Sequence, residues 1–165
     1  MRKIVLVVHN VRSAHNVGSI LRTADGLGMD KVYLTGYTPH PPSAKDKRLP
    51  HMAQKIGRQI NKTALGAEET VAWQYEPDIM SAIKKLKDAG YSLAALEQTT
   101  EAISLADFKP PAKLALLVGS EVGGLEKAVL GLCDIHLQIP MSGKKESFNV
   151  AIAAAIALYH LKNLT

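Results

Sequence analysis

The sequence predicts an α/β fold, a mostly parallel sheet of about six strands with helices on both faces. Short strand-like runs alternate with helical patterns along the chain, and these runs are continuously apolar, as in strands that are covered on both faces. No linker, repeat or low-complexity tract interrupts the pattern. With 47% hydrophobic and 21% charged residues, we therefore expect a single globular domain spanning residues 1–165.

In the N-terminal half, two strand-like runs flank a helical pattern. "KIVLVV" (residues 3–8) and "KVYLTG" (residues 31–36) are typical of buried strands. Between them, "VGSILRTADGLG" (residues 17–28) repeats its apolar residues with the helical period of 3.6. Ser13 or Asn16 can cap the start of this helix, and Gly28 can end it. The Pro-rich basic stretch from residue 38 to about residue 66 is expected to be a loop that contains a short helix.

The C-terminal half continues the alternation. "TVAWQY" (70–75) is a third strand, and "PDIMSAIKKLKDAG" (77–90) is a helix that Pro77 can begin and Gly90 can end. "YSLAALEQ" (91–98), "KLALLVGSE" (113–121) and "DIHLQIP" (134–140) are the remaining strands, with a short helix at 125–132. The final helix is expected to begin near Ser147 or Asn149 and to reach about Leu161. Its many alanines allow another helix to pack closely, and that neighbour can belong to a second subunit.

Three polar, glycine-rich loops follow the first, fifth and sixth predicted strands, at residues 9–16, 119–124 and 141–147. In parallel sheets, ligands bind beyond the carboxyl ends of the strands. We therefore expect one site that is built from all three loops.

Several common chemistries lack their sequence patterns. There is no G-x-G-x-x-G dinucleotide fingerprint, which excludes a typical nucleotide-binding oxidoreductase, and there is no P-loop, G-x-S-x-G or H-E-x-x-H pattern. Cys133 is the single cysteine, so an internal disulfide framework and a cysteine-based zinc site are excluded. No run has the length of a signal-peptide core or a membrane span. We expect a cytoplasmic protein without a metal and without membrane contact.

The start of the first helix is suited to an anion. Its free N–H groups and dipole favour negative charge, and Arg22 lies in an otherwise apolar helix. Because arginine is seldom buried without a partner, a phosphate or a carboxylate is expected to face it. The alternative is a pair between Arg22 and Glu121 that only holds two loops together. Both roles can coexist.

The charge distribution indicates an anionic partner. Net charge is +5, and residues 43–62 contain six lysines and arginines against one acid, Asp46. Such a stretch is suited to the phosphates of RNA.

Together, three segments resemble the motifs of the SPOUT superfamily of RNA methyltransferases, in its SpoU/TrmH branch. They are "NVGSILRTADGLG" (16–28), "LVGSEVGGL" (117–125) and "IPMSGKKESFNVAIAAAIALYH" (139–160). The resemblance implies a deep C-terminal trefoil knot, a homodimer, S-adenosylmethionine as the cofactor, and methylation of a ribose 2′-hydroxyl in tRNA or rRNA. The segments "KTALGAEETVAWQY" (62–75) and "ALEQT" (95–99) are similar to members that act on guanosine in tRNA. A non-catalytic RNA-binding protein or chaperone on the same scaffold is the alternative.

The resemblance also assigns residues. Catalytic roles fall to Arg22, Asn16, Glu121, Ser147 and Asn149. Cofactor contacts fall to Leu117, Val118, Gly119, Glu121, Gly124, Ile139, Met141, Ser147 and Asn149. RNA contacts are expected from Arg12, Arg22, Lys47, Arg48 and Arg58.

Two positions depart from the family pattern. Val122 replaces a common glycine and Phe148 a common leucine, so the fit around the cofactor can differ. Arg22 can activate the hydroxyl or bind the adjacent phosphate. No separate RNA-binding segment is evident, so recognition is expected from the domain, its dimer partner or another protein.

Overall fold

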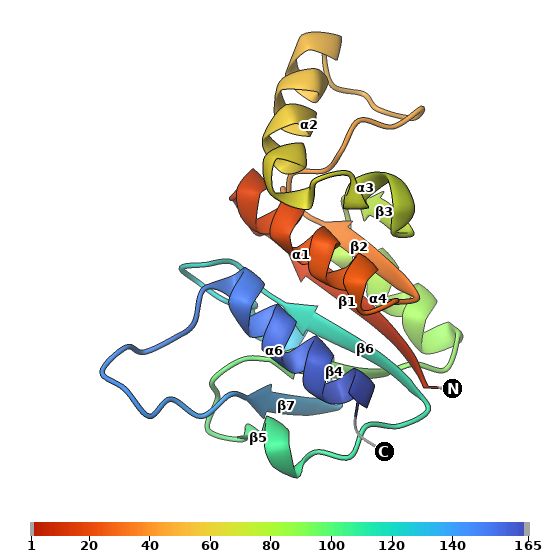
Figure 1. Cartoon of the computed structure of the whole chain (residues 1–165). Helices are drawn as coiled ribbons and strands as arrows, with labels where there is room; N and C mark the ends of the chain where they lie inside the picture. The colour runs from red at the N-terminus through yellow and green to blue at the C-terminus, as the bar shows by residue number, and fades with distance from the viewer. Residues whose placement is uncertain (1, 164–165) are drawn as a thin grey trace.

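Seven parallel strands form one sheet through the middle of the molecule (Figure 1). The strands of the computed structural model, which describes residues 2–163, are β1 Lys3–His9, β2 Lys31–Thr35, β3 Trp73–Glu76, β4 Ser92–Leu96, β5 Ile103–Ser104, β6 Lys113–Val118 and β7 Ile135–Gln138. Their order is β3-β2-β1-β6-β4-β7-β5, and every pair is parallel. The predicted fold class is confirmed. The seventh strand, β5, is two residues long and leaves no pattern in the sequence.

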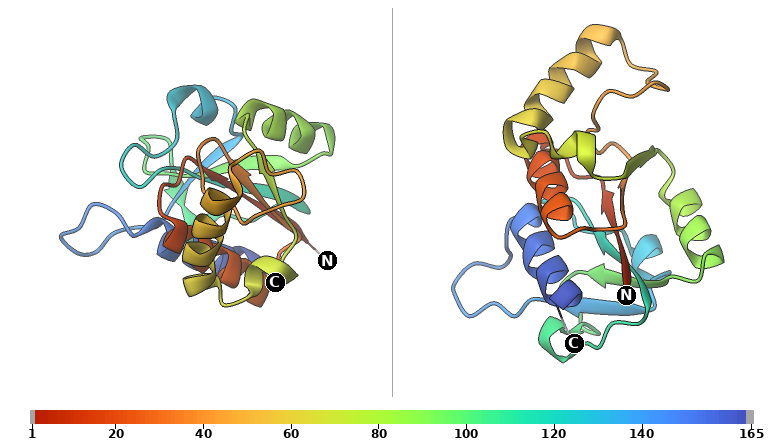
Figure 2. Two further views of the ribbon diagram at one scale, coloured as in Figure 1. Left: turned by 90° about the horizontal axis from the view of Figure 1, so that it is seen from above. Right: turned by 45° about the vertical axis from the view of Figure 1, so that its right-hand side comes forward.

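Helices cover both faces of the sheet (Figure 2). They are α1 Ala14–Gly26, α2 Pro50–Ala64, α3 Ala67–Thr70, α4 Ile79–Asp88, α5 Lys127–Leu130 and α6 Val150–Asn163, with a 3₁₀ turn, η1, at Leu105–Asp107. Helices α1 and α6 lie side by side on one face, and α4 and α5 lie on the other.

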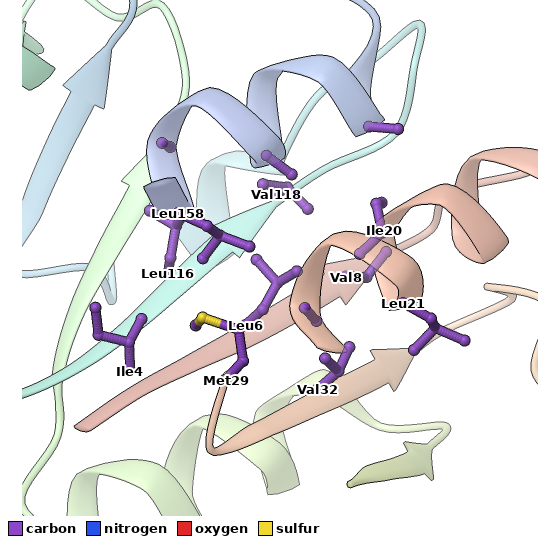
Figure 3. Packing of buried hydrophobic residues seen from close by; sticks show 14 of the residues in the cluster. Ile4, Leu6, Val8, Ile20, Leu21, Met29, Val32, Leu116, Val118 and Leu158 are labelled. Atoms are coloured by element: carbon purple, nitrogen blue, oxygen red, sulfur yellow. The ribbon is translucent and has the colours of Figure 1, made fainter. Parts of the chain in front are cut away.

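Each central strand supplies apolar side chains to two cores. Leu6 and Val8 of β1 and Leu116 of β6 pack against Ile20 of α1 and Leu158 of α6 (Figure 3). The alternate residues of the same strands pack under α4 and α5, because successive side chains of a strand point to opposite faces. This double burial explains why the strands are continuous apolar runs.

The basic stretch differs from its prediction, since α2 is fifteen residues long and not a short helix. Only Ala53, Ile60 and Ala64 are buried on it, and most of its other residues are polar. Its C-terminal half crosses α1 closely. A Cβ atom added at Gly18 would lie 2.2 Å from the carbonyl oxygen of Ile60. The third strand begins at Trp73 and not at residue 70, because residues 67–70 form α3.

Side-chain hydrogen bonds at the helix starts show where each predicted helix begins. The Ser13 hydroxyl accepts a hydrogen bond from Asn16 N at 3.2 Å, so Ser13 caps α1. Helix α4 begins after Asp78, whose carboxylate accepts from the N–H groups of the first turn, and Pro77 lies outside the helix. Helix α6 follows Asn149, whose side-chain oxygen accepts from Ala151 N at 2.9 Å. Side-chain oxygens satisfy N–H groups that have no partner within the helix.

Candidate functional site

Hydrogen bonds join the three predicted loops at the carboxyl edge of the sheet. The Glu121 carboxylate, in the loop after β6, accepts from Arg12 N at 3.1 Å and Ser13 N at 3.3 Å, both in the loop after β1. It also accepts from the Asn16 side-chain amide at 3.1 Å. The Asn149 amide, which follows the loop after β7, donates to the Asn16 oxygen at 3.2 Å. Asn16 thus connects Glu121 with Asn149, and the three loops meet at one place.

Glu121 is held as a carboxylate. Partial burial raises the pKa of this carboxyl group, but the hydrogen bonds from Arg12, Asn16 and Ser13 favour the charged form and lower the pKa overall. A charged carboxylate that accepts several N–H groups fixes the geometry of two loops, and it is a poor proton donor near neutral pH.

Arg22 lies apart from this junction. The predicted pair between Arg22 and Glu121 is wrong, because the Glu121 oxygens accept from the β1 loop and from Asn16. Arg22 is exposed on α1, and within residues 2–163 it has no hydrogen bond or ion pair. Six residues separate it from Asn16, so the two side chains point in different directions around the helix.

The loop after β6 folds into a tight turn that requires glycine. Ser120 N donates to Gly124 O at 3.2 Å, and Gly124 N donates to Ser120 O at 3.1 Å. A Cβ atom at Gly119 would lie 2.3 Å from the Gly124 carbonyl carbon, and Gly124 has φ of 63°. Leu117 and Val118 are buried in the core, so they can offer only backbone groups to a ligand.

A cavity of about 120 Å³ opens between the ends of β4 and β7 and the start of α6. Of the predicted cofactor residues, Ile139 and Ser147 line it. The other predicted cofactor residues lie outside its lining, namely Leu117, Val118, Gly119, Glu121, Gly124, Met141 and Asn149. Sequence reasoning missed the contribution of Leu96, Glu97 and Gln98, which directly follow or end β4. Gln98 donates to Glu146 O at 2.8 Å, and Glu97 accepts from Leu125 N at 3.1 Å. The polar "EQT" after a buried strand was the signal.

The predicted RNA-binding residues differ in their surroundings. Lys47 and Arg58 are exposed, as is Arg12, whose guanidinium carbon lies 6.0 Å from the centre of the Tyr37 ring. Arg48, in contrast, donates from Nε to Asp46 at 2.9 Å and from Nη2 to the His40 carbonyl at 3.1 Å. It organises the segment between β2 and α2, and its role toward RNA stays a prediction.

Two negative findings concern residues 2–163. No group of three or more His, Cys, Asp or Glu side chains there could hold a metal ion. No helix in this part of the chain has the length and apolar character that crossing a membrane requires.

The model of the SpoU rRNA Methylase family matches residues 3–159. The chain belongs to this family. It is 30% identical over 157 residues to a protein of Staphylococcus epidermidis and 31% identical to one of Staphylococcus aureus strain COL, each named "Putative TrmH family tRNA/rRNA methyltransferase". These matches cover 95% of the chain and 57% of the relatives. The chain therefore spans little more than half the length of these relatives.

Solved structures share the SpoU fold. The AdoMet-bound rRNA methyltransferase from Sinorhizobium meliloti has a TM-score of 0.81 at 21% identity, covering 99% of this chain and 57% of that one, which shows the fold alone. The SpoU methyltransferase AviRb from Streptomyces viridochromogenes, in complex with AdoMet, has a TM-score of 0.75 at 26% identity, with coverage of 98% and 57%. A structure described for 2-OH methylation of C/U34 on tRNA has a TM-score of 0.76 at 25% identity, with coverage of 97% and 94%.

Proposed function

We propose that this chain transfers a methyl group from S-adenosylmethionine to a ribose 2′-hydroxyl of structured RNA, either tRNA or rRNA. The observation that carries the proposal is the junction of Asn16, Glu121 and Asn149, which gathers the three motif loops beside a cavity. Membership of the SpoU family supports methyl transfer to RNA. The relatives solved with AdoMet, and the one described for 2-OH methylation, support the cofactor and the acceptor group.

The lining of the small cavity suits the adenosyl part of the cofactor. Leu96, Ile139 and Phe148 supply apolar surface, and Glu97 and Ser147 supply polar groups that can recognise a nucleoside. The volume of about 120 Å³ is below the roughly 300 Å³ of ordinary ligand pockets. Residues 140–149 border the cavity and are mostly exposed, so this segment has to move outward when the cofactor binds.

The chemistry requires alignment of the hydroxyl and removal of its proton. The cofactor supplies an electrophilic methyl group, so no metal is required. Arg22 carries a positive charge that binds the neighbouring phosphate and stabilises the developing alkoxide. Direct proton abstraction by Arg22 is the less favourable role, because a guanidinium group does not give up its proton in proteins and so cannot act as a base. Glu121 and Asn16 keep the loops in place while the RNA approaches.

We further propose that the protein acts as a homodimer with a trefoil knot near its C-terminus, as the family resemblance implies. Support for a dimer comes from one exposed stripe on α6. Ile152, Ile156 and Tyr159 are 53%, 38% and 64% exposed, and their spacing of four and three residues places them on one face. Apolar residues in such a row favour contact with a second copy.

Methyl transfer to total tRNA and rRNA tests the proposal. We expect Arg22→Ala to lower the rate by about 100-fold or more, the usual effect of losing one transition-state contact, while cofactor affinity changes little. Lys87→Ala on α4, on the far face of the sheet, is the control and should keep the wild-type rate. Near-normal turnover of Arg22→Ala would remove its catalytic role. Tight RNA binding without any methyl transfer would favour the non-catalytic alternative.

Mapping of the methyl groups in RNA identifies the nucleotide that is modified. We propose a guanosine in tRNA, in line with the sequence similarity noted for "ALEQT" and residues 62–75. Mapping of 2′-O-methyl sites in RNA from cells that lack the protein would identify the position. A lost methyl group in rRNA alone would contradict a tRNA substrate.

A further inference from the structure

A second, larger cavity lies away from the motif junction. It has a volume of about 920 Å³ and opens between segment 40–48 and the edge strand β3. Three rings form one side of it, those of His40, Trp73 and Tyr75, and Lys45 and Lys47 lie at its border.

Ring stacking and hydrogen bonds hold the three aromatic rings in place. His40 stacks on Tyr75 with ring centres 4.0 Å apart and planes inclined by 22°, and the Trp73 ring centre lies 6.2 Å from that of His40. The polar atoms of Trp73 and Tyr75 form hydrogen bonds within the protein. Trp73 Nε1 donates to Glu68 O at 2.9 Å, and the Tyr75 hydroxyl donates to Gly36 O at 2.8 Å. Because these bonds fix the rings, flat apolar surface remains for a ligand.

The three rings carry no charge, and the two lysines at the border of the cavity are positively charged. Burial lowers the pKa of His40, and the nearby Arg48 charge lowers it further, so the ring is neutral at pH 7. Asp46 is neutralised by Arg48, whose hydrogen bonds hold the pKa of this carboxyl well below its usual range. Lys45 and Lys47 are exposed, and neither has a hydrogen bond or ion pair within residues 2–163. Two free positive charges therefore stand beside an aromatic surface.

The aromatic cavity lies on the same edge of the sheet as the motif junction. It runs along the edge strand β3, from Trp73, the first residue of that strand, to Pro77, just beyond its carboxyl end, and Glu121 follows the carboxyl end of β6. Three strand spacings separate β6 from β3, which corresponds to about 14 Å. Arg12 and the 55% exposed Tyr37 lie in contact between the two places, in the loops after β1 and β2. An RNA strand can thus follow one edge of the sheet.

We infer that the aromatic cavity binds an unpaired nucleotide of the RNA substrate, several positions from the methylated one. Its base packs against the rings of Trp73 and Tyr75, and its phosphates contact Lys45 and Lys47. Aromatic side chains are the usual platform for unpaired bases, and lysines neutralise the phosphates. An acidic peptide would satisfy the lysines but would leave the ring surface unused. The inference rests on the proposed function and specifies its substrate as RNA with an accessible loop or single-stranded segment.

Trp73 is the only tryptophan of the chain, so its fluorescence reports directly on this cavity. We expect a single-stranded RNA oligonucleotide to quench Trp73 fluorescence saturably, and the same sequence in a duplex to have little effect. The double variant Lys45→Ala, Lys47→Ala should weaken binding at least tenfold. It should also reduce the slope of log K against log salt by about 1.4, the value for two phosphate contacts on a single strand. The matched control, Lys84→Ala with Lys87→Ala on α4, should bind as the wild type does.

Unchanged fluorescence with RNA, quenching by an acidic peptide instead, or wild-type binding by the Lys45 and Lys47 double variant would each overturn the inference. Methyl transfer measured on the same samples separates the two proposals. Methylation without any effect on Trp73 removes the nucleotide site and leaves the enzyme. Quenching without methylation removes the proposed activity and leaves an RNA-binding site.

Discussion

Gly119 tests how the tight turn after β6 supports the candidate site. An added Cβ atom would lie 2.3 Å from the Gly124 carbonyl carbon, 2.5 Å from its oxygen and 2.5 Å from Leu125 N. These are backbone atoms, so no side-chain rotation can relieve the contact. Overpacking of this kind costs about 1–3 kcal/mol.

The turn can respond to the added Cβ atom in two ways, by opening or by staying closed under strain. If the turn opens, the hydrogen bonds between Ser120 and Gly124 are lost. The loop after β6, which we propose contacts the cofactor, is then displaced while the domain stays folded. The dissociation constant for the cofactor then rises by about 5- to 150-fold, which corresponds to 1–3 kcal/mol. If the turn stays closed, the strain lowers the melting temperature by about 2–4 °C per kcal/mol.

Calorimetric titration with S-adenosylhomocysteine and thermal unfolding together measure the effect of Gly119→Ala. Gly26→Ala is the matched control, because this glycine of α1 has no atom within 4 Å of an added Cβ and should leave the dissociation constant for the cofactor unchanged. A Gly119→Ala protein with wild-type affinity and wild-type melting temperature would refute the reasoning from the turn.

Two further predictions concern the packing of the domain. Gly18→Ala should lower the free energy of unfolding in urea by about 1–3 kcal/mol, since the new Cβ would lie 2.2 Å from Ile60 O; Gly26→Ala, with open space around it, should raise it by up to about 1 kcal/mol. Equal effects of these two substitutions would contradict the close approach of α1 and α2. Burial, and to a lesser degree the charge of Asp134, raise the pKa of Cys133 to about 11, so the thiol stays protonated up to that pH. Iodoacetamide should therefore modify Cys133 slowly in the native protein at neutral pH and faster in urea, and equal rates in the two states would show that the thiol is not buried.

The strands and the motif loops were predictable because their signals are local. The strands β1, β4 and β6 contain apolar runs of four or more residues. Both cap positions, Ser13 and Asn149, are of the residue types that accept N–H bonds at helix starts. The rule that ligands bind beyond the carboxyl ends of parallel strands placed three loops on one edge. The junction of Asn16, Glu121 and Asn149 agrees with that expectation.

The errors share one origin. A pair between Arg22 and Glu121 was the alternative to a phosphate facing Arg22, and the structure does not contain it, because Glu121 accepts from the loop after β1 and from Asn16. The length of α2 was underestimated because most of its residues are polar and only three are buried. Glu97 and Gln98 were missed because the sequence does not say that β4 lies beside β7.

By itself, the sequence determined the fold class, the parallel strands and the three loops that share an edge, since each follows from the pattern of neighbouring residues. Only the tertiary structure decided which polar groups meet. The order of strands in the sheet brought Glu97 to the small cavity, and the path of segment 40–48 brought His40 against Trp73 and Tyr75. Such contacts join residues that are distant in the chain, and no local period carries information about them.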